Sequence, residues 1–253
     1  MPKLHALCCG RLRFDRSIFF PDKSPGVDMT VPVPSFLVMH PKGNLLFDTG
    51  VHCLAASEPE QRLGERTAGL FKLVGAADEV LPAQLAKLGL KTNDIHTVVN
   101  SHLHFDHCGC NALFPDVPIL VQKTELDAAR APKSHAHAQS WDLPLDYRPI
   151  DGEYDVFGDG SVLLFPTPGH TPGHQSMRVR VSRDQAFVAT ADACYTREHM
   201  DGELLSGRVW DPIQMIDSMR QLRRLGERSD THLIFGHDAA QWAALPTGST
   251  SLG

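Results

Sequence analysis

Short apolar runs separated by Gly, Pro and Asp recur along the whole chain. Runs of this length bounded by turn residues are typical of buried β-strands. Two of them are joined by Pro41-Lys42-Gly43, which predicts a β-hairpin. The strands predicted in the first half are Lys3–Leu12, Ser35–His40, Asn44–Asp48, Ile95–Val99 and Val117–Val121. Those predicted in the second half are Tyr147–Asp151, Ser161–Pro166, Ser176–Val181, Gln185–Thr190 and His232–Phe235.

Three segments instead repeat apolar residues at helical spacing. The clearest opens with Asp211-Pro212, an N-cap followed by proline in the first turn. It carries Ile216, Met219 and Leu222 on one face and ends at Gly226. The other predicted helices are Ala77–Leu88, with Asp78 as its N-cap, and Lys123–Arg130.

The remaining segments show neither period. Repeated prolines predict that Asp15–Pro34 is mostly loop. Ser57–Gly75 is polar with scattered apolar residues, which fits either a loosely held helix or a flap. Lys133–Trp141 is predicted to be loop, and its pair His135 and His137 is interpreted as solvated because no other ligand type is close in the sequence.

Two β-rich halves that each carry helices predict an α/β fold, arranged as a four-layer αββα sandwich. A chain of 253 residues is long enough for one large domain or two small ones. Because no linker and no short-period repeat separates the halves, we expect a single domain over residues 1–253.

Composition excludes several classes of partner. Apolar residues make up 42% and charged residues 21%, which are globular values. The formal net charge is −6 and no basic block is present, so a nucleic-acid substrate is disfavoured. No apolar run approaches the ~18 residues of a membrane span, and the N-terminus lacks a secretory pattern. We therefore expect a cytoplasmic protein without a membrane partner.

The densest group of reactive side chains follows the predicted strand Ile95–Val99. The pattern His-x-His-x-Asp-His places His102, His104, Asp106 and His107 close together. Residues two apart in extended backbone point the same way, so the first two histidines can bind one metal ion. If the chain then turns into helix, Asp106 and His107 point elsewhere and reach a second metal. Imidazole and carboxylate ligands suit zinc and similar divalent ions.

Three further candidate ligands follow predicted strands. His170 lies in Thr167-Pro-Gly-His-Thr-Pro-Gly-His174, whose glycines and prolines favour a defined turn. Asp192 and His237 each come directly after a strand. Because strand ends bring these residues to one edge, we expect one shared site, with His174 in a supporting role rather than as a ligand.

Two features near these ligands have more than one interpretation. Asp48 in Asp48-Thr49-Gly50 is either part of an ordinary turn or an acid that orients a metal-bound histidine. The six cysteines follow no zinc-ribbon or secreted-scaffold spacing, so reduced thiols are expected. Cys108 and Cys110 flank the metal pattern, and a redox role for them is the alternative.

Taken together, these patterns resemble the metallo-β-lactamase superfamily, over a span from about Phe36 to Asp238. The carrying features are His-x-His-x-Asp-His, a later Pro-Gly-His, a lone Asp and a final Gly-His. The closer match is to the N-acyl-homoserine lactonases, because Tyr195 follows Asp192 by three residues. The sequence departs from them at Cys108-Gly-Cys110, where members usually carry small residues. The resemblance implies the αββα sandwich of the metallo-β-lactamase type.

The resemblance also implies a centre of two divalent metal ions, preferably Zn²⁺. The implied ligands are His102, His104 and His170 for the first ion, Asp106, His107 and His237 for the second, and Asp192 for both. Two carboxylates and a bridging hydroxide offset much of the metal charge. A water shared by two metals has its pKa lowered from 15.7 to roughly 7 or below.

The implied reaction is opening of the lactone ring of N-acyl-homoserine lactones, which would make the protein a quorum-quenching hydrolase. The bridging hydroxide attacks the ring carbonyl, which the first metal and Tyr195 polarise. The second metal stabilises the departing alkoxide, and Asp106 relays a proton. Phe105, Leu70 and Phe71 are candidates for an apolar acyl-chain trough, although all three suit a core equally. The expected partner is a small-molecule lactone, and the expected assembly is a monomer or homodimer.

Other hydrolases on the same scaffold would carry nearly the same ligands. A pyridoxolactonase-like lactonase, a glyoxalase II-like thioesterase and a β-lactamase are alternatives, because a single sequence shows pockets poorly. The absence of a basic cluster argues against glutathione thioesters. An iron-dependent persulfide dioxygenase is less favoured, because its fold relatives hold one iron with fewer residues. A non-catalytic structural metal site is disfavoured because such sites usually use cysteine.

Overall fold

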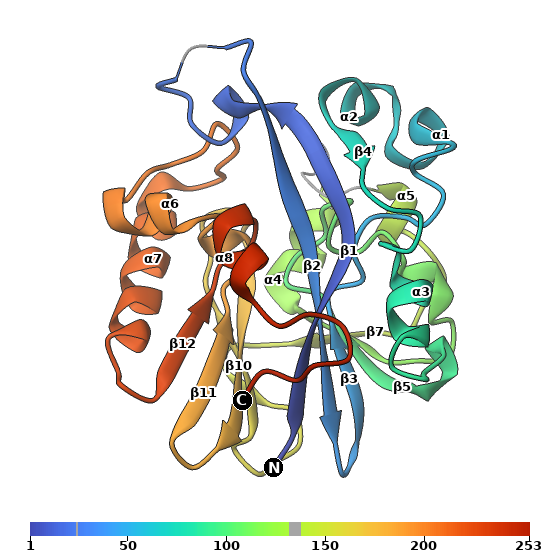
Figure 1. The fold of residues 1–253 in the computed structure, drawn as a ribbon, viewed down its shortest axis with the longest axis vertical. Coiled ribbons are helices and arrows are strands. Elements are labelled where there is room, and N and C mark those ends of the chain that lie inside the picture. The colour runs from blue at the N-terminus through green and yellow to red at the C-terminus, as the bar shows by residue number, and fades with distance from the viewer. Residues whose placement is uncertain (24, 132–137) are drawn as a thin grey trace.

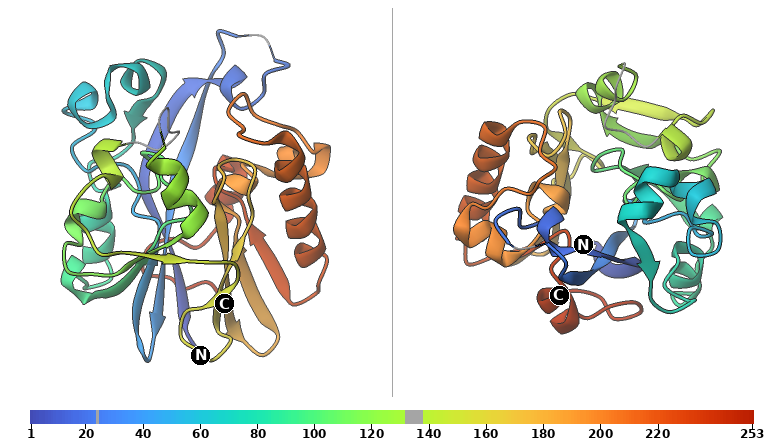
Figure 2. Two further views of the ribbon diagram at one scale, coloured as in Figure 1. Left: turned by 180° about the vertical axis from the view of Figure 1, so that it is seen from behind. Right: turned by 90° about the horizontal axis from the view of Figure 1, so that it is seen from above.

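The computed structural model describes residues 1–23, 25–131 and 138–253. Two β-sheets pack against each other, and helices cover their outer faces on opposite sides of the molecule (Figure 1). The views from behind and from above show the same four layers (Figure 2). The predicted αββα sandwich is therefore confirmed.

Within the described residues, the first sheet has seven strands in the order β4-β1-β2-β3-β5-β6-β7. Its first four strands pair antiparallel, and β3, β5, β6 and β7 pair parallel. The strands are β1 Lys3–Asp15, β2 Asp28–His40, β3 Gly43–Phe47, β4 Lys72–Val74, β5 Ile95–Val99, β6 Ile119–Gln122 and β7 Tyr147–Ile150. The predicted hairpin is β2–β3, and Gly43 takes the positive φ of 132° at its turn.

In the part of the chain that the structure describes, the second sheet has five strands in the order β12-β11-β10-β9-β8. Strands β11 and β12 pair parallel, and the other neighbours pair antiparallel. The strands are β8 Tyr154–Asp155, β9 Val162–Pro166, β10 Gln175–Ser182, β11 Gln185–Ala189 and β12 Thr231–Ile234. Since β10 runs opposite to both neighbours, β9, β11 and β12 all end at the same edge of this sheet.

Alternate residues of each strand enter different cores, because successive side chains point to opposite faces. Between the sheets, Val38 and Phe47 of the first sheet pack with Met177 of the second. On the outer face of the first sheet, Leu46 packs with Leu85 of a covering helix. The helices are α1 Pro59–Leu63, α2 Glu65–Leu70, α3 Leu81–Ala86, α4 Lys123–Ala129, α5 Ala138–Trp141, α6 Arg197–Gly202, α7 Pro212–Gly226 and α8 Ala239–Ala244.

The prediction that Asp15–Pro34 is mostly loop was wrong for its second half. Strand β2 begins at Asp28 and includes Pro32 and Pro34. Both prolines pair only with β1, beyond the end of β3, and the pairing shifts register between Cys8 and Arg11 at this point. Proline is tolerated at such a bulge and where a strand has one neighbour. The same strand pair extends β1 past the predicted end at Leu12.

Three further predictions also need correction. The helix predicted at Ala77–Leu88 is only α3, because Pro82 sets its first turn and Val80 is its N-cap. Asp78 instead pairs with Lys87 at 2.7 Å. Ser57–Gly75 forms α1, α2 and β4 rather than one helix or a flap. Part of the predicted loop Lys133–Trp141 is helix α5, while residues 132–137, with both loop histidines, lie outside the described residues.

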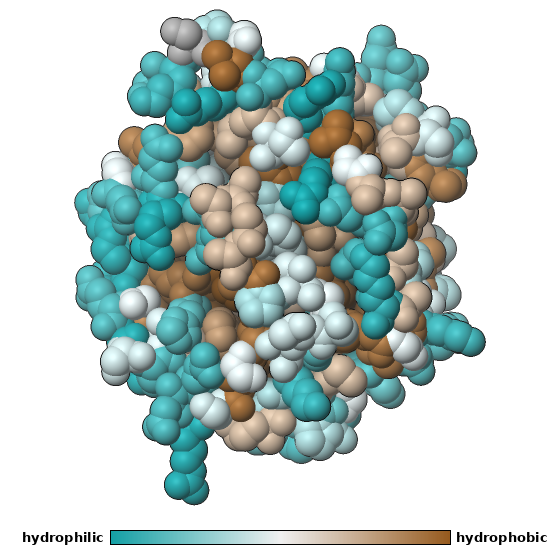
Figure 3. Space-filling model, viewed as in Figure 1, coloured by the Kyte–Doolittle hydropathy of each residue, from teal (hydrophilic) through white to brown (hydrophobic). Residues whose placement is uncertain are grey.

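On the face shown in Figure 3, hydrophilic residues cover much of the outline, while apolar residues lie both near the centre and at parts of the outline. Among the residues that the structure describes, none of the helices has the length and apolar character that a membrane span requires. The single-domain organisation of residues 1–253 stays a prediction.

Candidate metal centre

All predicted metal ligands meet at one end of the sandwich. His102, His104, Asp106 and His107 lie in the segment that follows β5 of the first sheet. The other three follow strands of the second sheet, in the order β9, β11 and β12. These three are His170, Asp192 and His237. The facing edges of two sheets therefore build one site.

Three imidazole nitrogens and a carboxylate form the first cluster. His104 Nδ1 lies 2.9 Å from His102 Nε2 and 3.0 Å from His170 Nε2. Asp192 Oδ2 lies 3.2 Å from His170 Nε2 and 3.8 Å from His102 Nε2. Ligands bound about 2.1 Å from one zinc ion are separated by roughly 3 Å, which matches this spacing.

Asp106, His107 and His237 form the second cluster. Asp106 Oδ2 lies 3.8 Å from the Nε2 atoms of both histidines. Asp192 reaches this cluster too, because its Oδ1 lies 3.2 Å from His107 Nε2 and 3.1 Å from His237 Nε2. One carboxylate of Asp192 thus faces both clusters, one oxygen to each.

Two buried atoms show that this donor set fits divalent ions. His107 Nε2 and Asp192 Oδ1 are buried and, within the described part of the chain, make no hydrogen bond. Unpaired buried polar atoms are strongly unfavourable unless a further partner satisfies them. Nitrogen and oxygen donors without thiolate are what zinc, manganese or iron bind in catalytic sites.

Asp48 holds His107 from behind, so the orienting interpretation of this residue agrees with the geometry. Its Oδ2 accepts a hydrogen bond from His107 Nδ1 at 2.8 Å. Ser101 donates to Asp48 twice, from its backbone N–H at 2.7 Å and from its hydroxyl at 2.8 Å. A proton held on Nδ1 leaves Nε2 free to bind metal.

Backbone carbonyls orient two further histidines. His237 Nδ1 donates to the carbonyl of Pro32 at 2.8 Å, which links a ligand to strand β2. His170 Nδ1 lies 3.2 Å from the carbonyl oxygen of Arg208 and 3.0 Å from Tyr195 Oη. Long-range pairs of this kind set the ring tautomer before any metal arrives.

Burial and the charges of neighbouring residues shift the pKa values of Asp192 and of His102. Burial alone would raise the pKa of Asp192, but the charges of His107 and His237 outweigh it and hold that pKa well below its ordinary value. Burial lowers the pKa of His102 well below its ordinary value, and neighbouring histidines add to this. The ionised carboxylate of Asp192 and the neutral imidazole of His102 are both suited to bind a cation.

Sequence reasoning missed Glu125 of α4, which joins the two ligand loops. Its Oε1 accepts from the backbone N–H of Leu103 and its Oε2 from that of Gly173, both at 3.0 Å. The side chain is fully buried. A Cβ at Gly173 would lie 2.1 Å from the Glu125 nitrogen, so only glycine fits there. An acid in a short helix gives no local signal of this role.

His174 lies behind the ligands rather than among them. Its Nε2 accepts the backbone N–H of Asp192 at 3.0 Å, and its Nδ1 lies 2.9 Å from Thr167 Oγ1. Burial lowers the pKa of His174 to about 3, so the ring stays neutral. The position of Asp192 is therefore supported by a neutral ring.

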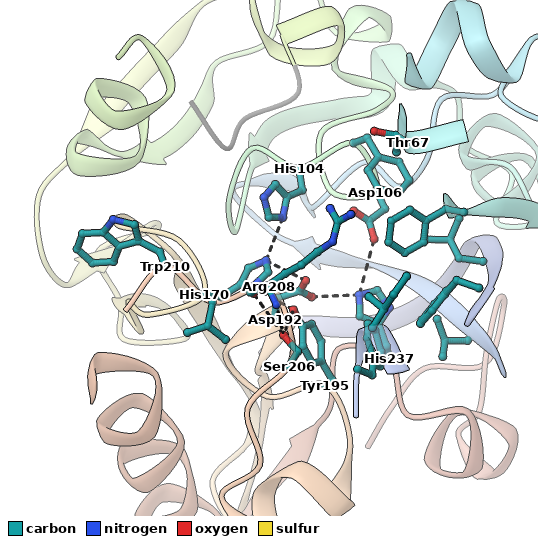
Figure 4. A pocket seen from close by; sticks show the side chains of 18 of the residues that line it. Thr67, His104, Asp106, His170, Asp192, Tyr195, Ser206, Arg208, Trp210 and His237 are labelled. Atoms are coloured by element: carbon teal, nitrogen blue, oxygen red, sulfur yellow. Dashed lines mark hydrogen bonds and ion pairs between the residues drawn. The ribbon is translucent and has the colours of Figure 1, made fainter. Parts of the chain in front are cut away.

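A cavity of about 460 Å³ opens above the two clusters. Figure 4 shows His104, Asp106, His170, Asp192 and His237 facing it, while Arg208 reaches across towards Asp106. Part of its wall comes from the 3₁₀ turn Arg16–Ile18 and Phe19, from α2 with Phe71, and from residues 206–210. None of these wall segments contains a candidate metal ligand.

Two of the three predicted substrate residues line this cavity. Phe71 and Phe105 lie 5.4 Å apart, centroid to centroid. Leu70 does not line it and is 39% exposed. Leu70 ends α2 and Phe71 is extended, so their side chains diverge. No sequence pattern predicted a role for Arg208, whose Cζ lies 5.2 Å from the Phe71 ring centroid.

Tyr195 lies beside the first cluster at the cavity floor. Its ring stacks on Phe19 at 4.2 Å, and Ser206 Oγ lies 3.4 Å from its hydroxyl. Burial raises the pKa of Tyr195 well above its ordinary value, and Asp192 raises it further. The phenol therefore stays protonated at neutral pH.

A family model described as "Metallo-beta-lactamase superfamily" matches residues 29–237, which contain every candidate ligand. The chain belongs to this superfamily. Within it, the chain is 33% identical to the N-acyl homoserine lactonase AttM of Azorhizobium caulinodans, over 96% of this chain and 95% of the relative. It is 32% identical to the N-acyl homoserine lactonase AiiA of Bacillus thuringiensis subsp. kurstaki, over 94% of each.

Solved structures of superfamily members show the same fold. An N-acyl homoserine lactone hydrolase with N-hexanoyl-L-homoserine bound at its catalytic metal centre matches with a TM-score of 0.88. Its sequence identity is 29%, over 99% of this chain and 98% of the other. The dizinc quorum-quenching lactonase AidC matches with a TM-score of 0.69 at 18% identity, and shows the fold alone.

Proposed function

We propose that this protein is a metal-dependent carboxylic ester hydrolase that opens the lactone ring of N-acyl-homoserine lactones. The observation that carries the proposal is the position of the Asp192 carboxylate, which places one oxygen beside each of the two ligand clusters. An apolar-walled cavity lies above both clusters. Relatives named N-acyl homoserine lactonases, about a third identical over nearly the whole chain, support the substrate class.

Seven residues are proposed to hold two divalent ions, with Zn²⁺ preferred. They are His102, His104 and His170 for the first ion, Asp106, His107 and His237 for the second, and Asp192 for both. When bound, two such ions supply a hydroxide nucleophile at neutral pH and polarise the ester carbonyl. The chain contributes the carboxylates and the fixed histidine tautomers that make this arrangement possible.

Tyr195 is proposed to donate a hydrogen bond to the carbonyl oxygen of the substrate. If His170 binds metal through Nε2, its Nδ1 keeps a proton and donates it to Tyr195 Oη or to the Arg208 carbonyl. The hydroxyl of Ser206 also points at Tyr195 Oη. The phenol hydrogen then remains available for the oxygen on which negative charge develops.

Asp106 is proposed to move the proton that ring opening requires. Its carboxylate borders the cavity and its Oδ2 faces the second cluster. From this position it accepts the proton of the nucleophile and returns it to the ring oxygen that leaves as an alkoxide.

Phe71 and Phe105 are proposed to bind the acyl chain, together with Phe14 and Phe19 on the same wall. Their rings exclude water from the apolar part of the substrate. Leu70 is left out of this proposal because it faces solvent. A monomer or homodimer remains the expected assembly.

The test is turnover of a panel of N-acyl-homoserine lactones by zinc-loaded protein, followed as proton release near pH 7.5. We expect rapid turnover by the wild type and none by Asp192→Ala. Tyr195→Phe should lower kcat roughly 10²-fold, the loss typical of one oxyanion donor, while its metal content stays unchanged. If metal content falls in parallel with kcat, Tyr195 acts through His170 instead.

Failure with every chain length, in protein shown to hold two metals, would exclude this substrate class. The search would then move to other lactones and to thioesters.

A further inference from the structure

Two thiols lie together directly behind the segment that carries the metal ligands. Cys53 Sγ and Cys110 Sγ are 3.0 Å apart, and neither is in a disulfide. A disulfide bond is about 2.05 Å long, so the two sulfurs are separated by roughly one further ångström. The sulfurs come from positions 57 residues apart in the chain, so the fold rather than local sequence brings them together.

The two thiols differ in access to solvent. Cys53 is half-buried, while Cys110 is 2% exposed, and the other four cysteines are buried as well. The hydrogen bond with Cys110 lowers the pKa of the Cys53 thiol, despite opposing burial. The same contact, with burial, raises the pKa of Cys110 well above its ordinary value. Cys53 is therefore the thiol that reacts first with an oxidant, and Cys110 is the neighbouring thiol that can react with the oxidised Cys53.

We propose that Cys53 and Cys110 are a modification site at which a peroxide forms a reversible disulfide. The Cys53 thiolate attacks one oxygen of hydrogen peroxide, which gives a sulfenic acid and hydroxide. The Cys110 thiol then attacks the Cys53 sulfur, forming the S–S bond and releasing water. The second thiol proton and the expelled hydroxyl form that water, so two thiols and one peroxide give one disulfide and two waters.

This bond would join two segments that already support the metal centre. Thr49 donates its backbone N–H to the His107 carbonyl at 2.7 Å, and Gly109 donates to the Gly50 carbonyl at 2.9 Å. Cys110 donates its N–H to Thr49 Oγ1 at 3.1 Å. The disulfide therefore adds a covalent link to the junction that positions Asp48 against His107, without touching a ligand atom.

A third thiol in the same hydrophobic core is an alternative partner for Cys53. Cys9 is 1% exposed and packs in the cluster that contains Cys110, with Cys53 at its border. Burial raises the pKa of Cys9 above the range in which a thiolate forms readily. We therefore expect oxidation to join Cys53 to Cys110 and to leave Cys9 reduced.

The test treats metal-loaded protein with a small excess of hydrogen peroxide and then denatures it for thiol counting and peptide mapping. We expect titratable thiols to fall from six to four, the intact mass to fall by the two hydrogen atoms lost, and one cross-linked peptide to contain Cys53 and Cys110. The melting temperature should rise by roughly 5–10 °C, and dithiothreitol should reverse the rise.

Matched variants distinguish this pair from general oxidation. Cys53→Ser, at a half-buried position, should keep its melting temperature unchanged under peroxide, and Cys110→Ala should do the same. Cys194→Ala removes a buried thiol far along the chain and should respond as the wild type does. A cross-link from Cys53 to Cys9, or sulfinic acid at Cys53 with all other thiols intact, would overturn the proposal.

Discussion

At the residue scale, the orientation of several ligands depends on a partner that lies far away in the sequence. His107 is held by Asp48, and His237 by the carbonyl of Pro32 on another strand. Because the partner fixes which nitrogen carries the proton, ligand residues alone do not determine metal affinity. The partners are therefore sensitive positions although they never face the cavity.

Replacing Asp48 should weaken metal binding while leaving every ligand in place. Asp48→Asn places an amide against His107 Nδ1, so the tautomer is no longer fixed, and the dissociation constant should rise roughly 10–100-fold. Competition with a chromophoric chelator measures it. The matched control is Asp159→Asn, which breaks a similar pair at the surface, where Asp159 lies 3.1 Å from His40. Equal affinities in both variants would contradict the orienting role of Asp48.

At the scale of elements, much of the site follows from one rule. The segments after β5, β9, β11 and β12 carry the ligands, and each of these strands is visible as a short apolar run. What the pattern did not show is the long pair β1–β2, because proline argues against a strand unless the pairing is known to be one-sided there. The position of a strand can be predicted from its own residues, whereas the number of strands that pair with it depends on the tertiary fold.

The same limit explains which site residues were missed. Glu125 is recognisable only once the loops containing Leu103 and Gly173 are seen on either side of it. Arg208 lies in a segment without regular structure, so no period predicts that its side chain enters the cavity. The ligands were predictable because they follow strand ends at close spacing, and the supporting residues were not because tertiary contacts define them.

Glu125 should be important for stability as well as for loop position. Glu125→Gln replaces one carboxylate oxygen with an amide NH₂ group, which cannot accept a hydrogen bond from the backbone N–H that faces it. We therefore expect a loss of about 2–3 kcal/mol in the free energy of unfolding. Denaturant titration measures this quantity. Glu60→Gln on exposed α1 is the control and should change it by less than about 0.5 kcal/mol. An equally small effect at Glu125 would show that its two hydrogen bonds are replaceable.

Helix α6 should give the fold a pH dependence through His199. This ring is buried, Nε2 donates to the Phe19 carbonyl at 3.0 Å, and burial lowers the pKa of His199 below its ordinary value. The unfolded chain binds the proton near pH 6.5, so this stabilisation is complete above that pH. Below pH 6.5 the contribution of His199 to the free energy of unfolding decreases by up to about 1.4 kcal/mol for each pH unit.

The measurement compares the free energy of unfolding of wild type and His199→Gln at pH 7.5 and pH 5. Glutamine keeps a donor for the Phe19 carbonyl but does not titrate. We expect the wild type to lose more stability than the variant on acidification. Parallel curves for the two proteins would show that His199 titrates alike in both states.

At the scale of the whole molecule, the metal centre is a junction between two halves. Four candidate ligands come from the first sheet and three from the second, and Asp192 faces both groups. A metal ion bound only by the folded protein stabilises it by a free energy that grows with the logarithm of the ion concentration divided by its dissociation constant. Metal binding is therefore expected to hold the two sheets together at the open end of the sandwich.

Removing the metal should lower the melting temperature reversibly. An ion at 1,000 times its dissociation constant contributes about 4 kcal/mol, so chelation should lower the melting temperature by roughly 10 °C, and added zinc should restore it. Scanning calorimetry measures this shift. Asp192→Ala, which lacks the shared carboxylate, should respond much less. An unchanged melting temperature in protein that has released two ions would rule out a joining role.

Part of the cavity wall comes from segments that supply no metal ligand, and this arrangement has a consequence for adaptation. Ile18, Thr67, Val209 and Trp210 shape the cavity from segments that supply no metal ligand. Random libraries at these positions should therefore yield many variants that still load metal, because the reactive centre is inherited intact. Single substitutions at these positions can therefore change which leaving groups and acyl-chain lengths of the substrate are accepted. This makes the protein a favourable starting point for directed evolution.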